Sequence, residues 1–196
     1  SIVSHDLRNP LSIIEGYVDQ AIETGEVDQL SRVQSAVDRM DTLIDDVLLL
    51  SRSDNAIGDR SAVGLADIAD DCWKTVPTEA STLRTVTDRT VRADETRLKQ
   101  LLENLFRNAI EHGGEDVTVT VGTLDDGFYV ADDGSGVPAA DRERIFDDGY
   151  SSTQAGTGLG LSIVAEIADA HGWTVDVTDG ADGGARFEII GVELVE

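Results

Sequence analysis

A single cysteine is present, and this scarcity limits the chemistry of the chain. Cys72 has no second cysteine with which to form an internal disulfide, and one thiol cannot build a cysteine-rich metal site. Its expected role is packing in a core. Long hydrophobic runs are missing as well, since no stretch of about 18 apolar residues occurs. The sequence therefore predicts neither a transmembrane helix nor a secretory signal peptide.

Lysine is also scarce. Only Lys74 and Lys99 occur, and 39 acidic residues against 15 basic ones give a net charge of −24. The acidic residues are spread along the chain, and no basic face is left to bind nucleic acid. A dispersed acidic excess with little lysine is typical of intracellular proteins from salt-loving, haloarchaeon-like organisms, where salt screens the self-repulsion. An ordinary acidic protein is the alternative.

The N-terminal part contains two amphipathic stretches. Apolar residues recur in steps of three and four along 2–24 and again along 29–53, close to a heptad seam. Gly25 ends the first stretch, and Asp28 can cap the second. We expect an antiparallel helical hairpin over 1–54 that pairs with a second copy into a four-helix bundle, because two helices bury little by themselves. Packing of the hairpin on its own chain is the alternative.

His5 lies on the first of these expected helices. It precedes the seam residue Leu7 by two positions, which turns it about 200° away from the seam and toward solvent. Pro10 removes a backbone donor and clashes with the carbonyl of Asp6, so a kink is expected at this turn. Taken alone, such a histidine is usually a surface residue without a role.

The remaining sequence alternates helices and strands. Residues 55–64 are expected to form a linker, and residues 65–196 a helix-plus-antiparallel-sheet domain, an α+β sandwich. The expected helices cover about 65–74, 94–112 and 160–171, and the expected strands lie within 82–92 and at 116–122, 127–132, 173–179 and 185–191. His171, at the end of a helix, is explained by a favourable interaction with the helix dipole and by capping.

The longest helix of this domain carries polar residues beside its apolar stripe. Asn104, Asn108 and His112 recur at every fourth position. Amides at such a margin line a cleft or satisfy nearby backbone groups. An amide oxygen is also a hard ligand suited to Mg²⁺. The helix by itself leaves both roles open.

Two glycine-rich segments follow a strand or precede a helix. The segment ADDGSGVP presents Asp132 at a strand end, where Gly134 and Gly136 allow a ligand to approach the backbone closely. The segment AGTGLGLSIV places successive backbone N–H groups at a helix start, an arrangement that binds anions. Each segment by itself is also compatible with an ordinary turn.

Taken in order, these segments resemble the catalytic core of sensor histidine kinases. SHDLRNPL is similar to the phosphoacceptor motif, NLFRNAIEH to the asparagine motif, and DDGSGVP and GTGLGLSIV to two glycine motifs. RIFDDGYSS is similar to a divergent phenylalanine motif, and DGGARFEI to the final glycine strand. The resemblance covers essentially the whole chain and implies the ATP-binding fold shared with gyrase, Hsp90 and MutL.

The resemblance implies a role for each matching residue. His5 would accept the γ-phosphate of ATP, and Asp6 would orient or deprotonate its ring. Asn9 would position water for dephosphorylation of a response regulator. Asn108 would bind Mg²⁺, with Asn104 beside it. The other implied ATP-binding residues are His112, Asp132 at the adenine amino group, Gly134, Gly136, Phe146, Gly156, Thr157, Gly158, Leu159 and Gly160.

The resemblance also implies partners and a location. The chain would form a homodimer through residues 1–54, and phosphate would pass from His5 to an aspartate of a response regulator receiver domain. The fragment would be cytoplasmic. Because the sequence begins within a repeating pattern, we expect a further region upstream, and any membrane anchor would belong to that region.

Two departures from the family pattern keep other functions open. No Lys or Arg occurs from Ile145 to Ala185, where the nucleotide lid is expected. This favours, as an alternative, a degenerate nucleotide-binding module that regulates or dephosphorylates a partner without kinase activity. Asn104 stands where related ATPases carry a water-activating Glu. An amide is a poor base, which argues against steady ATP hydrolysis, the third possibility.

Overall fold

The computed structural model describes residues 2–24, 30, 32–34, 36, 37, 40, 44, 57–76, 80–114, 116–147, 150 and 159–195, with the backbone alone for 2–10. The chain divides into two compact units. One contains the helical residues up to position 44, and the other contains the described residues from 57 onward. No described helix is long and apolar enough to cross a membrane.

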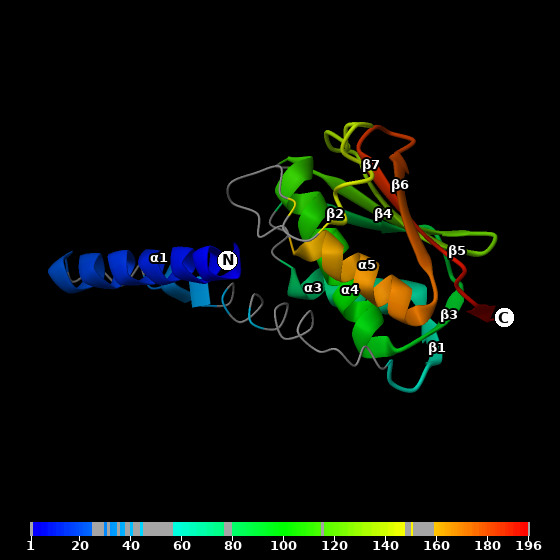
Figure 1. The fold of residues 1–196 in the computed structure, drawn as a ribbon, viewed down its shortest axis with the longest axis horizontal. Coiled ribbons are helices and arrows are strands. Elements are labelled where there is room, and N and C mark those ends of the chain that lie inside the picture. Colours follow the sequence, from blue (N-terminus) through cyan, green and yellow to red (C-terminus); the bar gives the residue numbers. More distant parts are fainter. Residues whose placement is uncertain are drawn as a thin grey trace. The chain divides into compact units, whose positions relative to one another are not determined.

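The first unit is helical, as the sequence predicts. Helix α1 runs from Ile2 to Thr24 and is continuous through Pro10 (Figure 1). The described residues between 30 and 44 are helical too, and Arg32 donates to the Tyr17 hydroxyl of α1 over 2.8 Å. This bond joins the two helical segments, as in the expected hairpin. The bundle with a second copy stays a prediction.

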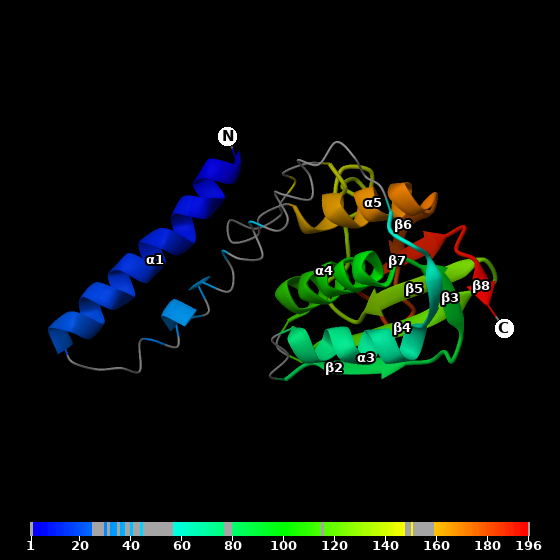
Figure 2. The ribbon, with the colours of Figure 1, turned by 90° about the horizontal axis from the view of Figure 1, so that it is seen from below.

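The second unit packs helices against one face of a larger sheet (Figure 2). Its elements are β1 (Ser61–Gly64), α3 (Leu65–Thr75), β2 (Thr82–Thr85), β3 (Thr90–Ala93), α4 (Glu95–Gly113), β4 (Thr118–Leu124), β5 (Gly127–Asp132), α5 (Gly160–His171), β6 (Thr174–Asp179), β7 (Ala185–Ile190) and β8 (Leu194–Val195). The expected arrangement of a helical region followed by an α+β domain is confirmed.

The larger sheet has the strand order β2-β4-β5-β7-β6 and is mixed rather than antiparallel. β4, β5, β7 and β6 pair antiparallel, but β2 runs parallel to β4, with Thr82 opposite Thr118. The expectation of a purely antiparallel sheet is wrong at this edge. Parallel neighbours require a long crossover, and β3 with α4 provides it between β2 and β4.

A second, three-stranded sheet was not expected from the sequence. Its order is β1-β3-β8, and all its pairs are antiparallel. Residues 61–64 of the expected linker form β1, because Val63 is buried when this segment pairs with β3. The single strand expected within 82–92 is two strands, β2 and β3, which belong to different sheets.

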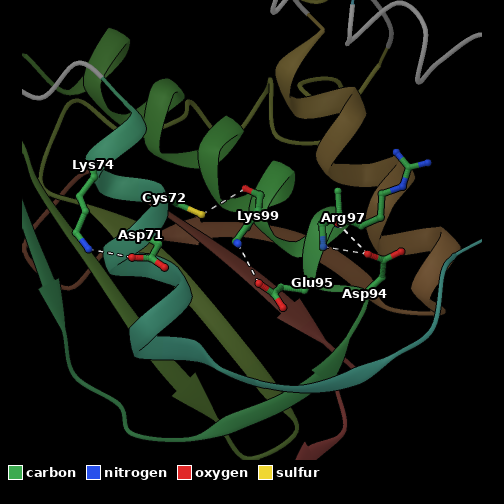
Figure 3. A network of polar contacts seen from close by, with 8 residues as sticks. Asp71, Cys72, Lys74, Asp94, Glu95, Arg97 and Lys99 are labelled. Atoms are coloured by element: carbon green, nitrogen blue, oxygen red, sulfur yellow. Dashed lines mark hydrogen bonds and ion pairs between the residues drawn. The ribbon is translucent and has the colours of Figure 1, made fainter.

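The core of the second unit is built around α4. Asp94 caps the helix, because its Oδ1 accepts hydrogen bonds from the backbone N–H groups of Thr96 at 3.0 Å and Arg97 at 3.2 Å (Figure 3). The buried residues of α4 are Leu98, Leu101, Leu102, Asn104, Leu105, Phe106 and Ala109. Cys72 of α3 is buried as predicted, and burial raises the pKa of its thiol to about 12.

Both lysines of the chain lie on the surface formed by α3 and α4. Lys74 pairs with Asp71 over 2.9 Å, and Lys99 pairs with Glu95 over 2.9 Å (Figure 3). All four side chains are exposed. Water and salt screen such pairs, so they contribute little to the stability of the unit.

Candidate functional site

The polar residues of α4 lie where this helix meets the start of α5. Asn104 is 6% exposed, and its Nδ2 donates to the carbonyl of Gln100 over 2.9 Å. Its Oδ1 faces Gly160, where a Cβ atom would lie 3.2 Å away. Glycine at that position therefore allows the two helices to approach closely. Asn108, one turn further along α4, is half-buried.

Asp132 lies at the end of β5 and is held by two backbone groups. Its Oδ1 accepts from the N–H of Gly134 at 2.9 Å and from the N–H of Ala185, the first residue of β7, at 3.1 Å. Its Oδ2 receives no hydrogen bond from the residues that the structure describes. One oxygen thus fixes the carboxylate, and the other is available to accept from a ligand amine.

Burial dominates the electrostatics of Asp132. Desolvation raises the pKa of this carboxyl above its ordinary value, while the two backbone hydrogen bonds oppose the shift. The neighbouring Asp133 raises the same pKa slightly, and His112 lowers it. The electrostatic effect of His112, near the end of α4, thus reaches Asp132.

Glycines bring three backbone segments together around Asp132. A Cβ on Gly134 would collide with the Cα of Gly113 at the end of α4. Gly136 has a positive φ of 71°, and a Cβ there would lie 3.0 Å from the carbonyl oxygen of Gly184. These close approaches explain why the sequence places glycines after Asp132 and before β7.

The loop that follows Gly136 is tied to the sheet. The half-buried ring of Phe146 packs edge-on against Phe187 of β7, with 6.4 Å between centroids. Arg142 donates to the carbonyl of Val137 over 3.1 Å and forms an ion pair with Asp179. No sequence pattern singles out Arg142, because its ion-pair partner Asp179 is 37 residues away along the chain.

Several predicted site residues lie outside what the structure describes. Gly156, Thr157 and Gly158 belong to this group, whereas Leu159 is described and buried directly before α5. The backbone of α1 carries the three expected catalytic residues in its N-terminal part, but their side chains are not described. These residues are His5, Asp6 and Asn9.

His171 fits its expected role in part, since its Nδ1 lies 2.8 Å from the carbonyl oxygen of Ile167 in the last turn of α5. It is 3% exposed, and burial lowers the pKa of its imidazole, which favours the neutral ring. Gly172, with a positive φ of 74°, also caps α5 through its own N–H. A neutral ring gains little from the dipole, so the contact of Nδ1 with the Ile167 carbonyl, and not a charge, joins His171 to the helix end.

Comparison with known proteins agrees with this arrangement. Residues 93–194 match the family described as histidine kinase-, DNA gyrase B- and HSP90-like ATPase. The chain belongs to this ATPase family. Residues 1–56 match the His Kinase A (phospho-acceptor) domain. The two matches follow the two structural units in the same order as the helical region and the α+β domain.

Individual relatives of this ATPase-family chain are sensor kinases. Sensor histidine kinase ZraS of Escherichia coli is 32% identical over 203 residues, covering 95% of this chain and 44% of that protein. Full-length ShkA in complex with AMPPNP superimposes with a TM-score of 0.66 at 28% identity, over 98% of this chain and 45% of that one. The chain thus spans less than half the length of the curated relatives it matches.

A third comparison concerns the fold alone. The structure of Acinetobacter baumannii histidine kinase AdeS superimposes with a TM-score of 0.68 at 20% identity. The match covers 95% of this chain and 98% of that one. The succession of helical region and α+β domain is therefore also found in a protein with few identical residues.

Proposed function

We propose that the chain is the catalytic core of a sensor histidine kinase in a two-component system. It would transfer the γ-phosphate of ATP to His5 and then pass it to an aspartate of a response regulator. The observation that carries this proposal is the geometry of Asp132. This half-buried carboxylate has one oxygen fixed by two backbone N–H groups and the other available to an amine.

Asp132 suits the adenine end of ATP. Its Oδ2 would accept a hydrogen bond from the exocyclic amino group, and partial burial strengthens that bond relative to one in water. Gly134 and Gly136 let the backbone of Gly113 and Gly184 pack closely beside it, which holds the carboxylate in a fixed position for a ligand. His112 would line the same end of the site.

The phosphate end of ATP would lie toward Asn104 and Asn108. The described residues contain no group of three or more His, Cys, Asp or Glu that could hold a metal ion. Mg²⁺ fits the site nonetheless, because it binds readily through one protein oxygen and several phosphate oxygens, and Asn108 offers an amide oxygen. When bound, the ion would neutralise phosphate charge.

Asn104 supports transfer to histidine over hydrolysis. An amide cannot take a proton from water, and the Nδ2 of Asn104 is engaged by Gln100. In the proposed reaction a ring nitrogen of His5 attacks the γ-phosphorus, a nitrogen–phosphorus bond forms, and the bond to the ADP oxygen breaks. Asp6 would orient the ring. Asn9 would position water when the kinase dephosphorylates its regulator.

The exposed seam of α1 supports a homodimer through residues 1–54. Leu11, which the heptad pattern places in the seam, is 44% exposed in the single chain. Pairing with a second copy would cover this side chain and its seam neighbours. Because ATP is supplied in the cytoplasm, we propose that this part of the protein works there.

The charge of the chain points to a salty environment. With a net charge of −24, self-repulsion is strong in dilute buffer and weak where the Debye length falls to about 3 Å, at about 1 M salt. We therefore propose that the protein is adapted to high salt, as in halophilic organisms. Unfolding of the purified chain across a KCl series would test this, since an ordinary acidic protein gains much less stability.

The decisive experiment uses ATP labelled at the γ-phosphate. The purified chain is incubated with labelled Mg·ATP in about 2–3 M KCl, where charge repulsion is screened. A histidine kinase retains label that survives alkali and is lost in acid. The label should disappear in His5→Gln, in Asn108→Ala and in Asp132→Asn. Of these, only His5→Gln should still bind ATP normally.

Two other outcomes would replace the proposal. Nucleotide binding without any label would indicate the regulatory or phosphatase module. That outcome is favoured by the absence of Lys and Arg from residues 145–185 and by the commitment of Arg142 to Asp179. Steady phosphate release without a labelled protein would indicate an ATPase. Retention of label by His5→Gln would place the phosphoryl group elsewhere.

A further inference from the structure

The segment just before β1 is bonded to both helices of the nucleotide site. The backbone N–H of Gly58 donates to Oδ2 of Asp94 over 2.8 Å. Nη2 of Arg60 donates to the carbonyl oxygen of His171 over 2.8 Å. Asp94 is the N-cap of α4 and His171 the last residue of α5. Residues 57–60 thus contact the N-terminus of α4 and the C-terminus of α5.

A buried imidazole joins these two helix ends directly. The backbone N–H of Asp94 donates to Nε2 of His171 over 3.1 Å. Nε2 must therefore be unprotonated, so Nδ1 carries the hydrogen and donates to the carbonyl of Ile167 over 2.8 Å. The ring also stacks on Trp173, with 4.0 Å between centroids. Both nitrogens and one face of the ring are thus engaged.

The two carboxylate oxygens of Asp94 have separate tasks. Oδ1 caps α4 through Thr96 and Arg97, and Oδ2 holds Gly58. One side chain therefore fixes the start of α4 and the segment 57–60 together. An asparagine at this position has a single oxygen acceptor, so it can serve one of these tasks but not both.

The start of α5 lies beside the middle of α4, where the proposed nucleotide site begins. α4 and α5 run antiparallel, since His171 at the end of α5 meets Asp94 before α4, and Gly160 at the start of α5 faces Asn104 halfway along α4. α5 is a continuous helix from Gly160 to His171. A shift of its last turn is therefore transmitted along a rigid element to its first turn, beside Asn104.

We propose that His171 is a positioning residue for the nucleotide site and that residues 57–60 act on it through Asp94 and Arg60. With the segment bonded, α5 is held in register with α4, and the start of α5 is fixed for nucleotide binding. When the segment is pulled away, this register loosens. The chain segment that follows the helical unit would thereby tune ATP affinity. The inference rests on the proposed function, because the ATP site is its readout.

The test compares variants of the full chain by backbone amide exchange and by titration with a fluorescent ATP analogue. Arg60→Met removes the donor to His171, and Asp94→Asn removes one acceptor of Asp94. Each should speed exchange within residues 160–171 and raise the Kd of the analogue about threefold, a modest fraction of a typical coupling between sites. Asp59→Asn, an exposed neighbour, is the matched control and should change neither.

Two substitutions of His171 separate positioning from simple packing. His171→Phe keeps a ring against Trp173 but loses both hydrogen bonds, and it should raise the Kd about tenfold. His171→Gln restores an acceptor for the Asp94 N–H and should recover most of the affinity. Circular dichroism and the Tm identify any variant that fails to fold. If the His171 variants do not fold, Arg60→Met, at an exposed residue, still tests whether residues 57–60 affect nucleotide binding.

One pattern would overturn the inference. If Arg60→Met and Asp94→Asn speed exchange at residues 57–60 alone and leave the Kd unchanged, the segment is a passive tether. Failure of the proposed function gives a different result: without kinase activity the unmodified chain still binds the analogue but retains no label from ATP, and without a nucleotide site it binds no analogue. Exchange within α5 would still report whether the segment and the helix are coupled.

Discussion

Helices α1 and α4 follow the same sequence rule and have opposite surroundings. Both carry apolar residues in steps of three and four. Seven residues of α4 are buried by strands and helices of its own unit, whereas no described side chain of α1 is fully buried. Leu11 and Ile13, which point to different sides of α1, are 44% and 42% exposed.

The difference shows what an amphipathic pattern determines. It determines which face of a helix is apolar. It does not determine whether the residues that bury this face belong to the same chain or to another. The apolar face of α4 is buried by its own chain, so the stability of α4 should not depend on protein concentration. We expect a second copy of the chain to bury the apolar face of α1, so the stability of α1 should rise with concentration.

Removal of a core side chain from α4 should have the largest effect. Phe106 is fully buried and meets Trp73 edge-on, with 5.4 Å between ring centroids. Phe106→Ala should lower the free energy of unfolding by about 3–5 kcal/mol, because it removes apolar contacts and leaves a cavity. Denaturant unfolding of the second unit at two protein concentrations measures this. A loss below about 1 kcal/mol, or a dependence on concentration, would contradict the assignment of α4 to an intramolecular core.

A charge in the α1 seam should have the next largest effect. Leu11→Asp should weaken dimerisation about 100-fold, because the carboxylate would be buried without a partner at the expected interface. Sedimentation across a concentration series measures the dissociation constant.

Ile13→Asp is the matched control, since Ile13 is equally exposed and lies on the other side of α1. It should leave the dimer intact, because it lies outside the seam. If the two substitutions weakened dimerisation equally, the seam of α1 would not be the dimer interface.

Acidification should produce a smaller effect, confined to the second unit. Burial holds the folded pKa of His171 below the ordinary value of about 6.5. As the pH falls through that value, the unfolded chain therefore takes up the proton first, and stability is lost by at most about 1.4 kcal/mol per pH unit. Arg60, Asp94 and Arg97 also act on this ring. Tm values between pH 7.5 and 5.5 should fall less in His171→Gln, and parallel curves would show that other groups control the dependence.

The fold was predictable where one element contained its own signal. Helix α5 and strand β5 occupy the residues expected from the sequence, 160–171 and 127–132. Strand β8 has two residues, too few to show alternation of apolar and polar side chains. Strand β1 is stabilised only when it pairs with β3, which lies far along the sequence. The direction of β2 depends on the crossover through α4, which no local pattern records.

The site divides in a similar way. Asp132 and its glycines were found because their spacing is local and their residue types are limited by chemistry. The N–H of Ala185 that fixes Asp132, and the contacts of His171 with Asp94, join positions far apart in the sequence. Such pairings depend on sheet register and helix packing, and a single sequence contains neither.

The scarcity of lysine has a practical consequence for spectroscopy. Reagents that acylate primary amines would find two side-chain targets, Lys74 and Lys99, and both lie on the surface of α3 and α4. A dye attached to Lys99 would be bonded to α4, the helix that also carries Asn104 and Asn108, whereas a dye on Lys74 would report from α3. Substituting one lysine by arginine would leave a single side-chain attachment point without engineered cysteines, from which the tumbling of the second unit could be followed optically.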